Sequence, residues 1–251
     1  MAIFAIGDLH LSLGVSKPMD VFRGWQDYVQ RLSDNWKQLI RPEDTVVLAG
    51  DTSWGMKLTD CTKDFAFLEA LPGQKLLLKG NHDYWWTTVS KMERYFAENN
   101  FTTLHFLHNN CLLTEGVALC GTRSWLFDIG QPHDEKVMNR EIGRLIMSLE
   151  AAGAEEKVVF LHYPPVYATA QAQEIIEVLH RYGVKRCYYG HLHGASIPRA
   201  VEGKVDGIEY KLISADGVRF CPVRIDPPLV TAVCDPNENA ADHGAAGGSI
   251  V

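Results

Sequence analysis

The sequence predicts an α/β fold, and three observations support this prediction. Short apolar runs of about four or five residues alternate with longer stretches in which apolar residues recur every three or four positions. Polar residues follow several of the apolar runs directly, often after a glycine. The chain has 251 residues, 46% of them hydrophobic, so it can bury a large core without disulfides or a structural metal. The alternation of short apolar runs with helical stretches is typical of sheets covered by helices.

The elements can be assigned in order along the chain. The predicted strands are the buried apolar runs at residues 2–6, 45–49, 75–79, 103–107, 158–161 and 186–189, together with a hairpin over 111–120. The predicted helices have helical periodicity and cover residues 21–40, 64–71, 134–150 and 170–182, with a further helix within 84–99. From residue 197 to about 233 the pattern indicates strands and turns.

No linker or internal repeat divides the chain, so we expect one domain over residues 1–234. The segment 235–251 is rich in Ala, Gly and Asn and has almost no large apolar residue before its last two positions. Because burial cannot offset its ordering entropy, we expect a disordered C-terminal tail.

Charge and hydrophobicity exclude several classes of protein. The 24 basic and 31 acidic residues give a formal net charge of −7, which argues against a protein that coats nucleic acid, although a local basic patch stays open. No run approaches the roughly 18 apolar residues of a membrane span, and Asp8 comes too early for a signal peptide. We therefore expect a soluble, cytoplasmic protein without membrane association, whose oligomeric state the sequence does not predict.

The six cysteines include no Cys-x-x-Cys pair, which argues against a zinc ribbon or a thioredoxin-like site. If residues 111–120 form a hairpin around Glu115-Gly116, Cys111 and Cys120 face each other. We expect two neighbouring thiols there, since disulfides are uncommon in the cytosol.

Five predicted strands end in residues that can bind metal ions. The segments that follow them are Gly7-Asp8-Leu9-His10, Gly50-Asp51-Thr52, Gly80-Asn81-His82-Asp83, His162-Tyr163-Pro164-Pro165 and Gly190-His191-Leu192-His193-Gly194. Ligands of open α/β sheets bind at the carboxyl ends of the strands, so we expect these side chains to converge. A glycine lets the backbone turn sharply and approach a ligand closely.

The candidate ligands number two Asp, one Asn and four His: Asp8, His10, Asp51, Asn81, His162, His191 and His193. Seven ligands are too many for one tetrahedral zinc, but they fit two divalent ions that share a carboxylate. A mixed oxygen and imidazole set favours Mn, Fe or Zn over Ca or Mg. Paired ions about 3.5–4 Å apart are suited to phosphoryl hydrolysis.

The series GDLH, GDTSWG, GNHD, HYPP and GHLHG, over roughly residues 5–194, resembles the calcineurin-like metallophosphoesterase superfamily, and within it the predicted phosphohydrolases of bacteria. The resemblance implies a four-layer αββα sandwich, with two central mixed sheets flanked by helices. It also implies a phosphohydrolase that cleaves phosphoester bonds by attack of a hydroxide bridging two metal ions. The expected partner is a small phosphorylated substrate.

The resemblance also implies a role for each residue. Asp8, His10 and His193 look like ligands of one metal, and Asn81, His162 and His191 look like ligands of the other, with Asp51 bridging both. His82 resembles the histidine that contacts the phosphoryl group and protonates the leaving oxygen. Asp83 occupies the place of the acidic residue that orients this histidine.

The sequence departs from the family's protein phosphatases at one motif. Those enzymes extend Gly-Asp with a further Asp-Arg-Gly, whereas residues 50–55 contain neither that Asp nor that Arg, which argues against a phosphatase of the eukaryotic type. Arg123 is our candidate for the cation that holds the substrate phosphate instead. Asp216 is either the partner of a metal ligand or an ordinary turn residue.

Several alternatives remain open. The four tryptophans near the motifs form either a ring-stacking rim or, as we favour, parts of the core: Trp54, Trp85, Trp86 and Trp125. Asn81 could serve as a turn residue, and His191 and His193 could lie in a plain surface turn. The chain as a whole could be a non-catalytic scaffold of the same fold, or a nuclease or phosphodiesterase of the same superfamily. The complete ligand set favours an enzyme.

Overall fold

The computed structural model describes residues 1–125 and 134–225, and within these ranges the strands form two large sheets and one two-stranded sheet. The first large sheet has the order β13-β1-β2-β3-β4, and the second has the order β11-β12-β10-β7-β6-β5. Neighbouring strands are parallel in the middle of both sheets, and antiparallel pairs occur at β13, β11 and β5 on their edges. Both sheets are therefore mixed.

The strands of the first sheet are β1 (Ile3–Ile6), β2 (Thr45–Leu48), β3 (Gln74–Leu77), β4 (Leu104–Phe106) and β13 (Val223–Arg224). The strands of the second are β5 (Cys111–Thr114), β6 (Val117–Thr122), β7 (Glu156–Leu161), β10 (Arg186–Tyr189), β11 (Gly203–Val205) and β12 (Ile208–Leu212). The small sheet pairs β8 (Val166–Tyr167) with β9 (Ala170–Gln171). The α-helices of the described residues are α1 (Tyr28–Leu39), α2 (Thr62–Glu69), α3 (Val89–Glu98), α4 (Glu135–Ala151) and α5 (Gln173–Arg181), with short 3₁₀ turns at Leu58–Cys61 and Gly194–Arg199.

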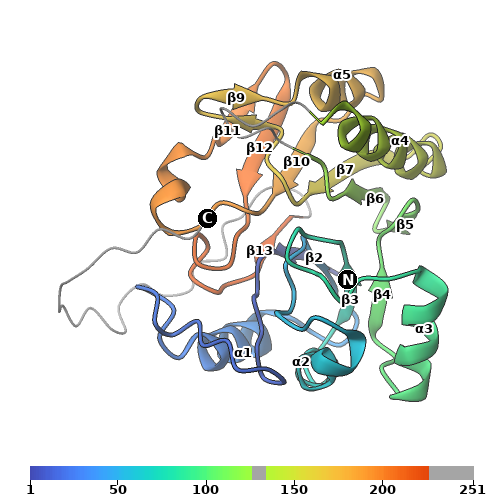
Figure 1. Ribbon diagram of the computed structural model, residues 1–251. Helices are drawn as coiled ribbons and strands as arrows, with labels where there is room; N and C mark the ends of the chain where they lie inside the picture. Colours follow the sequence, from blue (N-terminus) through green and yellow to red (C-terminus); the bar gives the residue numbers. More distant parts are fainter. Residues whose placement is uncertain (126–133, 226–251) are drawn as a thin grey trace.

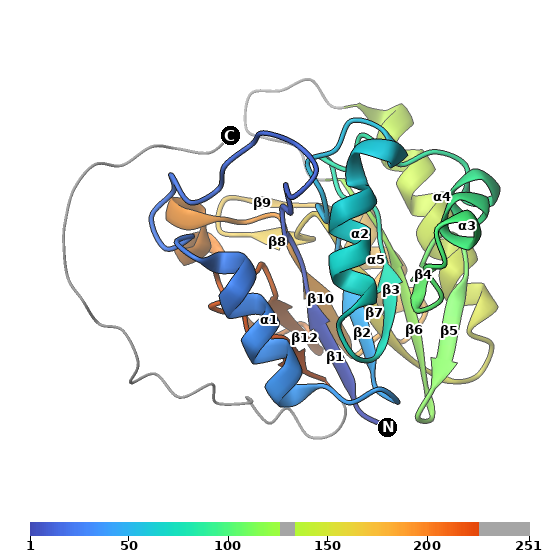
Figure 2. The ribbon, with the colours of Figure 1, turned by 90° about the horizontal axis from the view of Figure 1, so that it is seen from below.

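The two large sheets pack face to face, and helices cover their outer faces (Figure 1). Alternate residues of a strand point to opposite faces, so Ile3 and Ala5 enter the layer between the sheets while Phe4 and Ile6 pack under helices. Helices α1, α2 and α3 lie together on the first sheet, as the view in Figure 2 shows, and α4 and α5 cover the second. The predicted four-layer αββα architecture is confirmed.

Helix α1 begins at Tyr28, so the first seven residues of the helix predicted over 21–40 are not helical. Trp25 is buried in the core and packs edge-on against Phe220, and Gly24 and Asp27 have φ angles of 86° and 51°. The chain turns here to dock Trp25, which leaves Val21 exposed. The periodicity that starts at Val21 is therefore accidental.

The helix predicted over 170–182 also begins later than expected, because residues 170–171 form strand β9. The hairpin over 111–120 is confirmed: Cys111 lies opposite Cys120, and both thiols are free. Glu115 and Gly116 form its turn with positive φ angles of 50° and 76°, as a two-residue type I′ hairpin requires.

The expected tail at 235–251 lies outside the described residues. Within residues 1–125 and 134–225, no helix is both long enough and apolar enough to cross a bilayer.

Candidate metal centre

The segments that follow β1 and β2 are joined by backbone hydrogen bonds. The amide of Asp8 donates to the carbonyl of Gly50 (2.8 Å), and the amide of His10 donates to that of Asp51 (2.9 Å). Asp8, His10 and Asp51 all have positive φ angles, between 46° and 58°. Non-glycine residues rarely adopt this conformation, which costs about 1–3 kcal/mol per residue and is concentrated at functional sites. The fold thus maintains a strained backbone to present these side chains.

Two glycines make room for the carboxylates. A Cβ atom at Gly80 would lie 2.0 Å from Oδ1 of Asp51, and one at Gly190 would lie 2.3 Å from Oδ2 of Asp8. Both contacts are far closer than van der Waals separation. The glycine before each of these two polar motifs is therefore needed because a neighbouring motif's carboxylate fills the space.

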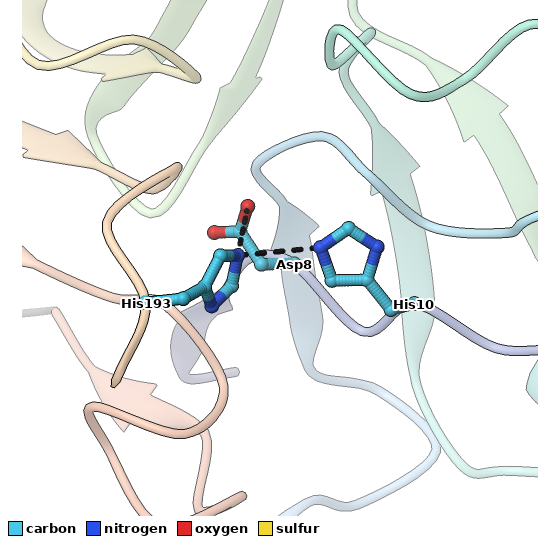
Figure 3. A group of neighbouring side chains, drawn as sticks. All are labelled: Asp8, His10 and His193. Carbon is cyan, nitrogen blue, oxygen red and sulfur yellow. Dashed lines mark hydrogen bonds and ion pairs between the residues drawn. The ribbon is translucent and has the colours of Figure 1, made fainter. Parts of the chain in front are cut away.

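Asp8, His10 and His193 form one group of ligand atoms (Figure 3). Nε2 of His193 lies 3.3 Å from Oδ1 of Asp8 and 3.2 Å from Nε2 of His10. The group draws on two loops, one after β1 and one after β10, which present one oxygen and two ring nitrogens to a common centre. Such a set can hold a divalent transition metal ion.

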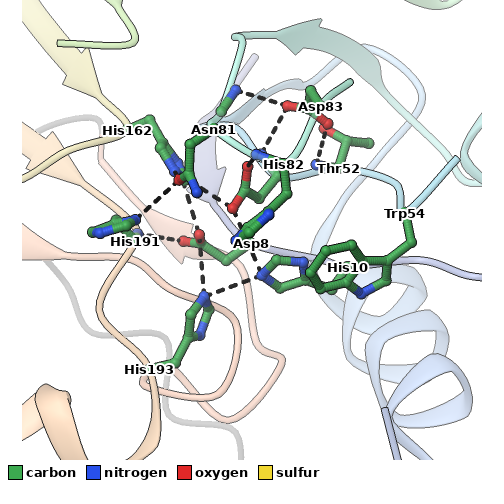
Figure 4. Close-up of polar contacts among 12 residues, drawn as sticks. Asp8, His10, Thr52, Trp54, Asn81, His82, Asp83, His162, His191 and His193 are labelled. Atoms are coloured by element: carbon green, nitrogen blue, oxygen red, sulfur yellow. Dashed lines mark hydrogen bonds and ion pairs between the residues drawn. The ribbon is translucent and has the colours of Figure 1, made fainter. Parts of the chain in front are cut away.

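A second group consists of Asp8, Asp51 and His162, and it shares Asp8 with the first. Figure 4 shows the ring of His162 pointing toward Asp8. Nε2 of His162 lies 3.5 Å from Oδ2 of Asp51, and the same oxygen lies 3.8 Å from Nε2 of His10. Oδ1 of Asp8 is likewise close to both groups, at 3.3 Å from His193 and 3.7 Å from His162. Both carboxylates thus lie between the two groups, whereas the sequence expectation gave the shared position to Asp51 alone.

Asn81 and His191 complete this second group. Oδ1 of Asn81 lies 2.5 Å from Nε2 of His162 and 3.1 Å from Nδ1 of His191. The backbone amide of His191 donates to Oδ2 of Asp8 (2.9 Å). The structure therefore brings all seven predicted ligands into one cluster of side chains.

The residues fit bound cations on three counts. Oδ1 of Asp8 is buried and accepts no hydrogen bond among the described residues, although the ring of His193 lies 3.3 Å away, so a bound cation can meet this oxygen. Burial and the neighbouring charges of Asp83 and Asp8 raise the pKa of Asp51 well above its ordinary value. Burial lowers the pKa of His162 to about 4 and that of His191, aided by His162, to about 3, so both rings are neutral at pH 7 and can donate lone pairs.

Hydrogen bonds fix the orientation of two of the histidines. Nδ1 of His193 donates to Oδ1 of Asp216 (2.9 Å), and Nδ1 of His162 donates to the carbonyl of Ala49 (3.1 Å). In each ring the Nε2 atom then faces the cluster, an arrangement typical of metal-binding histidines. Asp216 also accepts the amides of Gly194 and Gly217, so it is a turn residue and the partner of a candidate ligand at once.

Burial alone would lower the pKa of His193, but Asp8 and Asp216 raise it to about 10. The pKa of Asp8 is lowered although burial opposes this, because His193 and the other histidines stabilise the carboxylate. The site thus contains two close carboxylates whose charges only one ring partly offsets.

Asp83 is completely buried and accepts hydrogen bonds from the loops rather than from the ring of His82. Its donors are the amides of Asp51 (2.8 Å), Thr52 (2.9 Å), Ser53 (3.4 Å) and Gly80 (2.7 Å), and the indole of Trp85 (3.0 Å). These bonds hold the second and third motifs together. The described contacts therefore differ from the one that the resemblance implied for Asp83.

His82 lies at the margin of the cluster. Its backbone amide donates to Oδ1 of Asp51 (2.7 Å), and its ring centroid lies 4.7 Å from that of Trp54 and 5.8 Å from that of His10. Nδ1 lies 3.4 Å from the hydroxyl of Tyr84. Burial, and after it the charge of Lys17, lowers the pKa of His82. Its half-buried ring is thus adjacent to the cluster and reachable from solvent.

Arg123 contacts Glu141 rather than any residue of the cluster in the described part of the chain. Its Nη2 atom lies 3.4 Å from Oε1 of Glu141, and its guanidinium carbon lies 5.1 Å from the ring centroid of Trp125. The tryptophans do not form a common rim. Trp85 is a core residue, Trp54 stacks on His10 at 4.6 Å, Trp86 packs on Phe106, and Trp125 packs on Tyr163.

Sequence reasoning missed one residue that contacts the cluster and one that packs on its neighbour Trp54. The ring of Tyr163 lies 4.3 Å from that of His191, and Nζ of Lys17 lies 3.3 Å from the ring centroid of Trp54. Tyr163 follows a predicted ligand directly, which is a signal that could have identified it. Lys17 lies in an irregular segment with no pattern to single it out.

The sequence profile described as calcineurin-like phosphoesterase matches residues 1–195. The match covers most of the chain, and the chain belongs to this family. Among curated proteins, none matches the chain.

Solved structures resemble this fold at low sequence identity. The phosphopantetheinyl hydrolase of Mycobacterium tuberculosis superposes with a TM-score of 0.56 at 13% identity, covering 90% of this chain and 96% of its own. The protein TT1561 of Thermus thermophilus gives 0.53 at 13% identity, covering 86% and 89%. A protein of unknown function from Aquifex aeolicus, AQ665, gives 0.47 at 15% identity, covering 89% and 95%. At such identities the first two likenesses show the fold alone.

Proposed function

We propose that the chain is a binuclear metallophosphoesterase that hydrolyses a small phosphorylated substrate. The observation that carries the proposal is the pair of buried carboxylates, Asp8 and Asp51, each within 4 Å of ring nitrogens from both ligand groups. Like charges this close are costly to bury, and divalent cations would offset them. Family membership and the complete set of seven ligands support catalysis over a scaffold role.

Asp8, His10, His193 and Asp51 would hold one ion, and Asn81, His162, His191 and Asp51 would hold the other. The donor set favours Mn, Fe or Zn. Two such ions supply a hydroxide nucleophile at neutral pH and stabilise negative charge on the attacked phosphoryl group. The protein's own part is to fix the ligands, which Asp216, the Ala49 carbonyl and the strained loops do.

His82 is placed to give a proton to the leaving oxygen. Its ring borders the cluster, while its backbone amide anchors it to Asp51. Asp83 is a positioning residue in this proposal, since it holds together the loops that present Asp51 and His82. Lys17 brings a positive charge beside His82 and is a better placed cation for the transferred phosphoryl group than Arg123.

The test is a panel of phosphate monoesters, diesters and pyrophosphate esters, assayed with several divalent metals. We expect hydrolysis with Mn²⁺, and we expect Asp51→Asn to reduce it by about a hundredfold or more, since metal ions supply several kcal/mol of transition-state stabilisation. Asp44→Asn is the matched control, because Asp44 is also a buried aspartate but precedes β2 instead of following it. If Asp51→Asn retained more than about a tenth of the activity, the proposed ligand role would be wrong.

The same panel separates the alternatives. Single- and double-stranded nucleic acid in the panel tests the nuclease alternative. Hydrolysis of nucleic acid without hydrolysis of any small ester would contradict the proposed small substrate. A protein that hydrolyses nothing and takes up no transition metal would be a scaffold.

A further inference from the structure

A pocket lined by basic side chains lies beside the candidate metal centre. Its wall includes Lys79 after β3, Asn109 after β4, Arg123 after β6, and Glu141 and Arg144 on α4. Three basic side chains face one carboxylate, so these groups sum to +2 when all are charged. The chain as a whole carries −7, so this local charge is opposite in sign to the net charge.

Glu141 orders the two arginines but does not neutralise the pocket. It is completely buried and accepts hydrogen bonds from Thr122 (2.7 Å), Arg144 (2.8 Å) and Arg123 (3.4 Å). A carboxylate with these donors fixes both guanidinium groups, as residues beneath a binding site must do. One negative charge shared between two arginines leaves positive charge for a ligand.

An unsatisfied donor points to a missing acceptor. Nε of Arg123 is buried and has no hydrogen-bond acceptor among residues 1–125 and 134–225. Lys79, Arg123 and Arg144 all line this pocket, so three positively charged groups lie close together. An anionic oxygen would satisfy this donor and relieve the repulsion.

The pocket and the metal centre share chain segments. Lys79 lies two residues before Asn81. The carbonyl of Arg123 accepts the amide of Tyr163 (2.9 Å), which follows His162 directly and packs on the ring of His191. Lys79 and Arg144 are partly exposed, so a ligand can enter from solvent. The pocket and the metal centre are therefore joined through the segments that follow β3, β6 and β7.

We propose that this pocket binds an oxyanion of the phosphate type, and that it holds a second anionic group of the substrate while the first is hydrolysed. The second half of this proposal rests on the proposed function, whereas anion binding does not. Guanidinium and ammonium groups around one centre suit a phosphate, with the arginines contributing paired N–H donors. The substrate class is then a phosphate ester that carries a further phosphate or comparable anionic group.

The binding half is tested with inorganic phosphate and chelator-treated protein, by calorimetry at low ionic strength. We expect Lys79→Gln to weaken phosphate binding about tenfold, a typical loss for one charge-assisted contact, and Lys79→Arg to retain it. Arg140→Gln is the matched control, because Arg140 also lies near Glu141 (3.9 Å) but is half exposed and does not line the pocket. Melting temperatures of all variants check that they fold. Equal affinity in wild type, Lys79→Gln and Arg140→Gln, or no binding by wild type, overturns the proposal.

The substrate half is tested with Mn²⁺-loaded protein and two esters, an alkyl bisphosphate and the matching monophosphate. We expect Lys79→Gln to raise KM for the bisphosphate about five times more than KM for the monophosphate, in line with the loss of one charge-assisted contact. If Lys79→Gln raises KM equally for the two esters, the pocket does not hold a second group of the substrate and free phosphate is its ligand. If neither ester is hydrolysed while Lys79→Gln still weakens phosphate binding, the proposed function fails and the anion pocket stands.

Discussion

The layer between the sheets and the edge where the strands end both contain buried side chains. Burial stabilises the fold in the first region and destabilises it in the second. Phe160 and His162 illustrate this, because they lie two residues apart at the end of β7 and both are completely buried. Phe160 stacks on Tyr188 and gains from leaving water. His162 lies among carboxylates, and its burial carries a desolvation cost. Burial in the core therefore stabilises the fold, whereas burial at the edge costs free energy that the core has to offset.

The largest effect on stability is expected from Phe160→Ala. Removing most of a buried ring leaves a cavity, and such substitutions cost about 3–5 kcal/mol. Because the loss lies in the core, the free energy of unfolding should fall by the same amount with chelator and with Mn²⁺. Urea unfolding under both conditions measures this. A loss present only with Mn²⁺ would contradict the division into two regions.

His82→Ala should leave stability and metal content intact while kcat falls about a hundredfold, since a general acid contributes at least that much. The loss should grow with the pKa of the leaving alcohol, because poor leaving groups depend most on protonation. His105→Ala, which removes an exposed histidine from β4, is the control. A loss that is independent of the leaving group would remove the acid role from His82.

A smaller effect is expected from pH on the chelated protein. The pKa of His162 lies near 4 in the folded chain, against 6.5 for an ordinary histidine, so the unfolded chain takes up this proton first as the pH falls. Stability should therefore decrease from about pH 6.5 toward pH 4, by about 2 kcal/mol at pH 5 from this group. Denaturant unfolding of His162→Asn should show a shallower decline. His180→Asn, on the exposed face of α5, should lose stability with falling pH as the wild type does. If wild type, His162→Asn and His180→Asn all lost stability equally, burial of His162 would carry no cost.

The sequence predicts much of this molecule because its strands are uninterrupted apolar runs and its ligands follow them directly. The sequence alone places five of the ligands at strand ends: Asp8, Asp51, Asn81, His162 and His191. β1, β2 and β3 lie in one sheet and β7 and β10 in the other, and contacts among these side chains show that the ends of both sheets meet. Local pattern and global fold agree at these positions.

What the sequence does not predict depends on contacts between distant segments. The start of α1 is set by Trp25 packing on Phe220, a residue near the other end of the described chain. The donors to Asp83 come from backbone amides of neighbouring loops, which no residue pattern records. Lys17 reaches Trp54 from an irregular segment, and Arg123 is drawn to Glu141 on α4. Tertiary packing alone decides these positions.

A crystal structure of Mn²⁺-loaded protein with anomalous scattering tests most directly whether the strand ends form a site for two divalent ions. We predict two ions about 3.5–4 Å apart, with Asp8 and Asp51 in contact with them. A single ion, or ions bound elsewhere while Oδ1 of Asp8 has no cation beside it, would contradict the account.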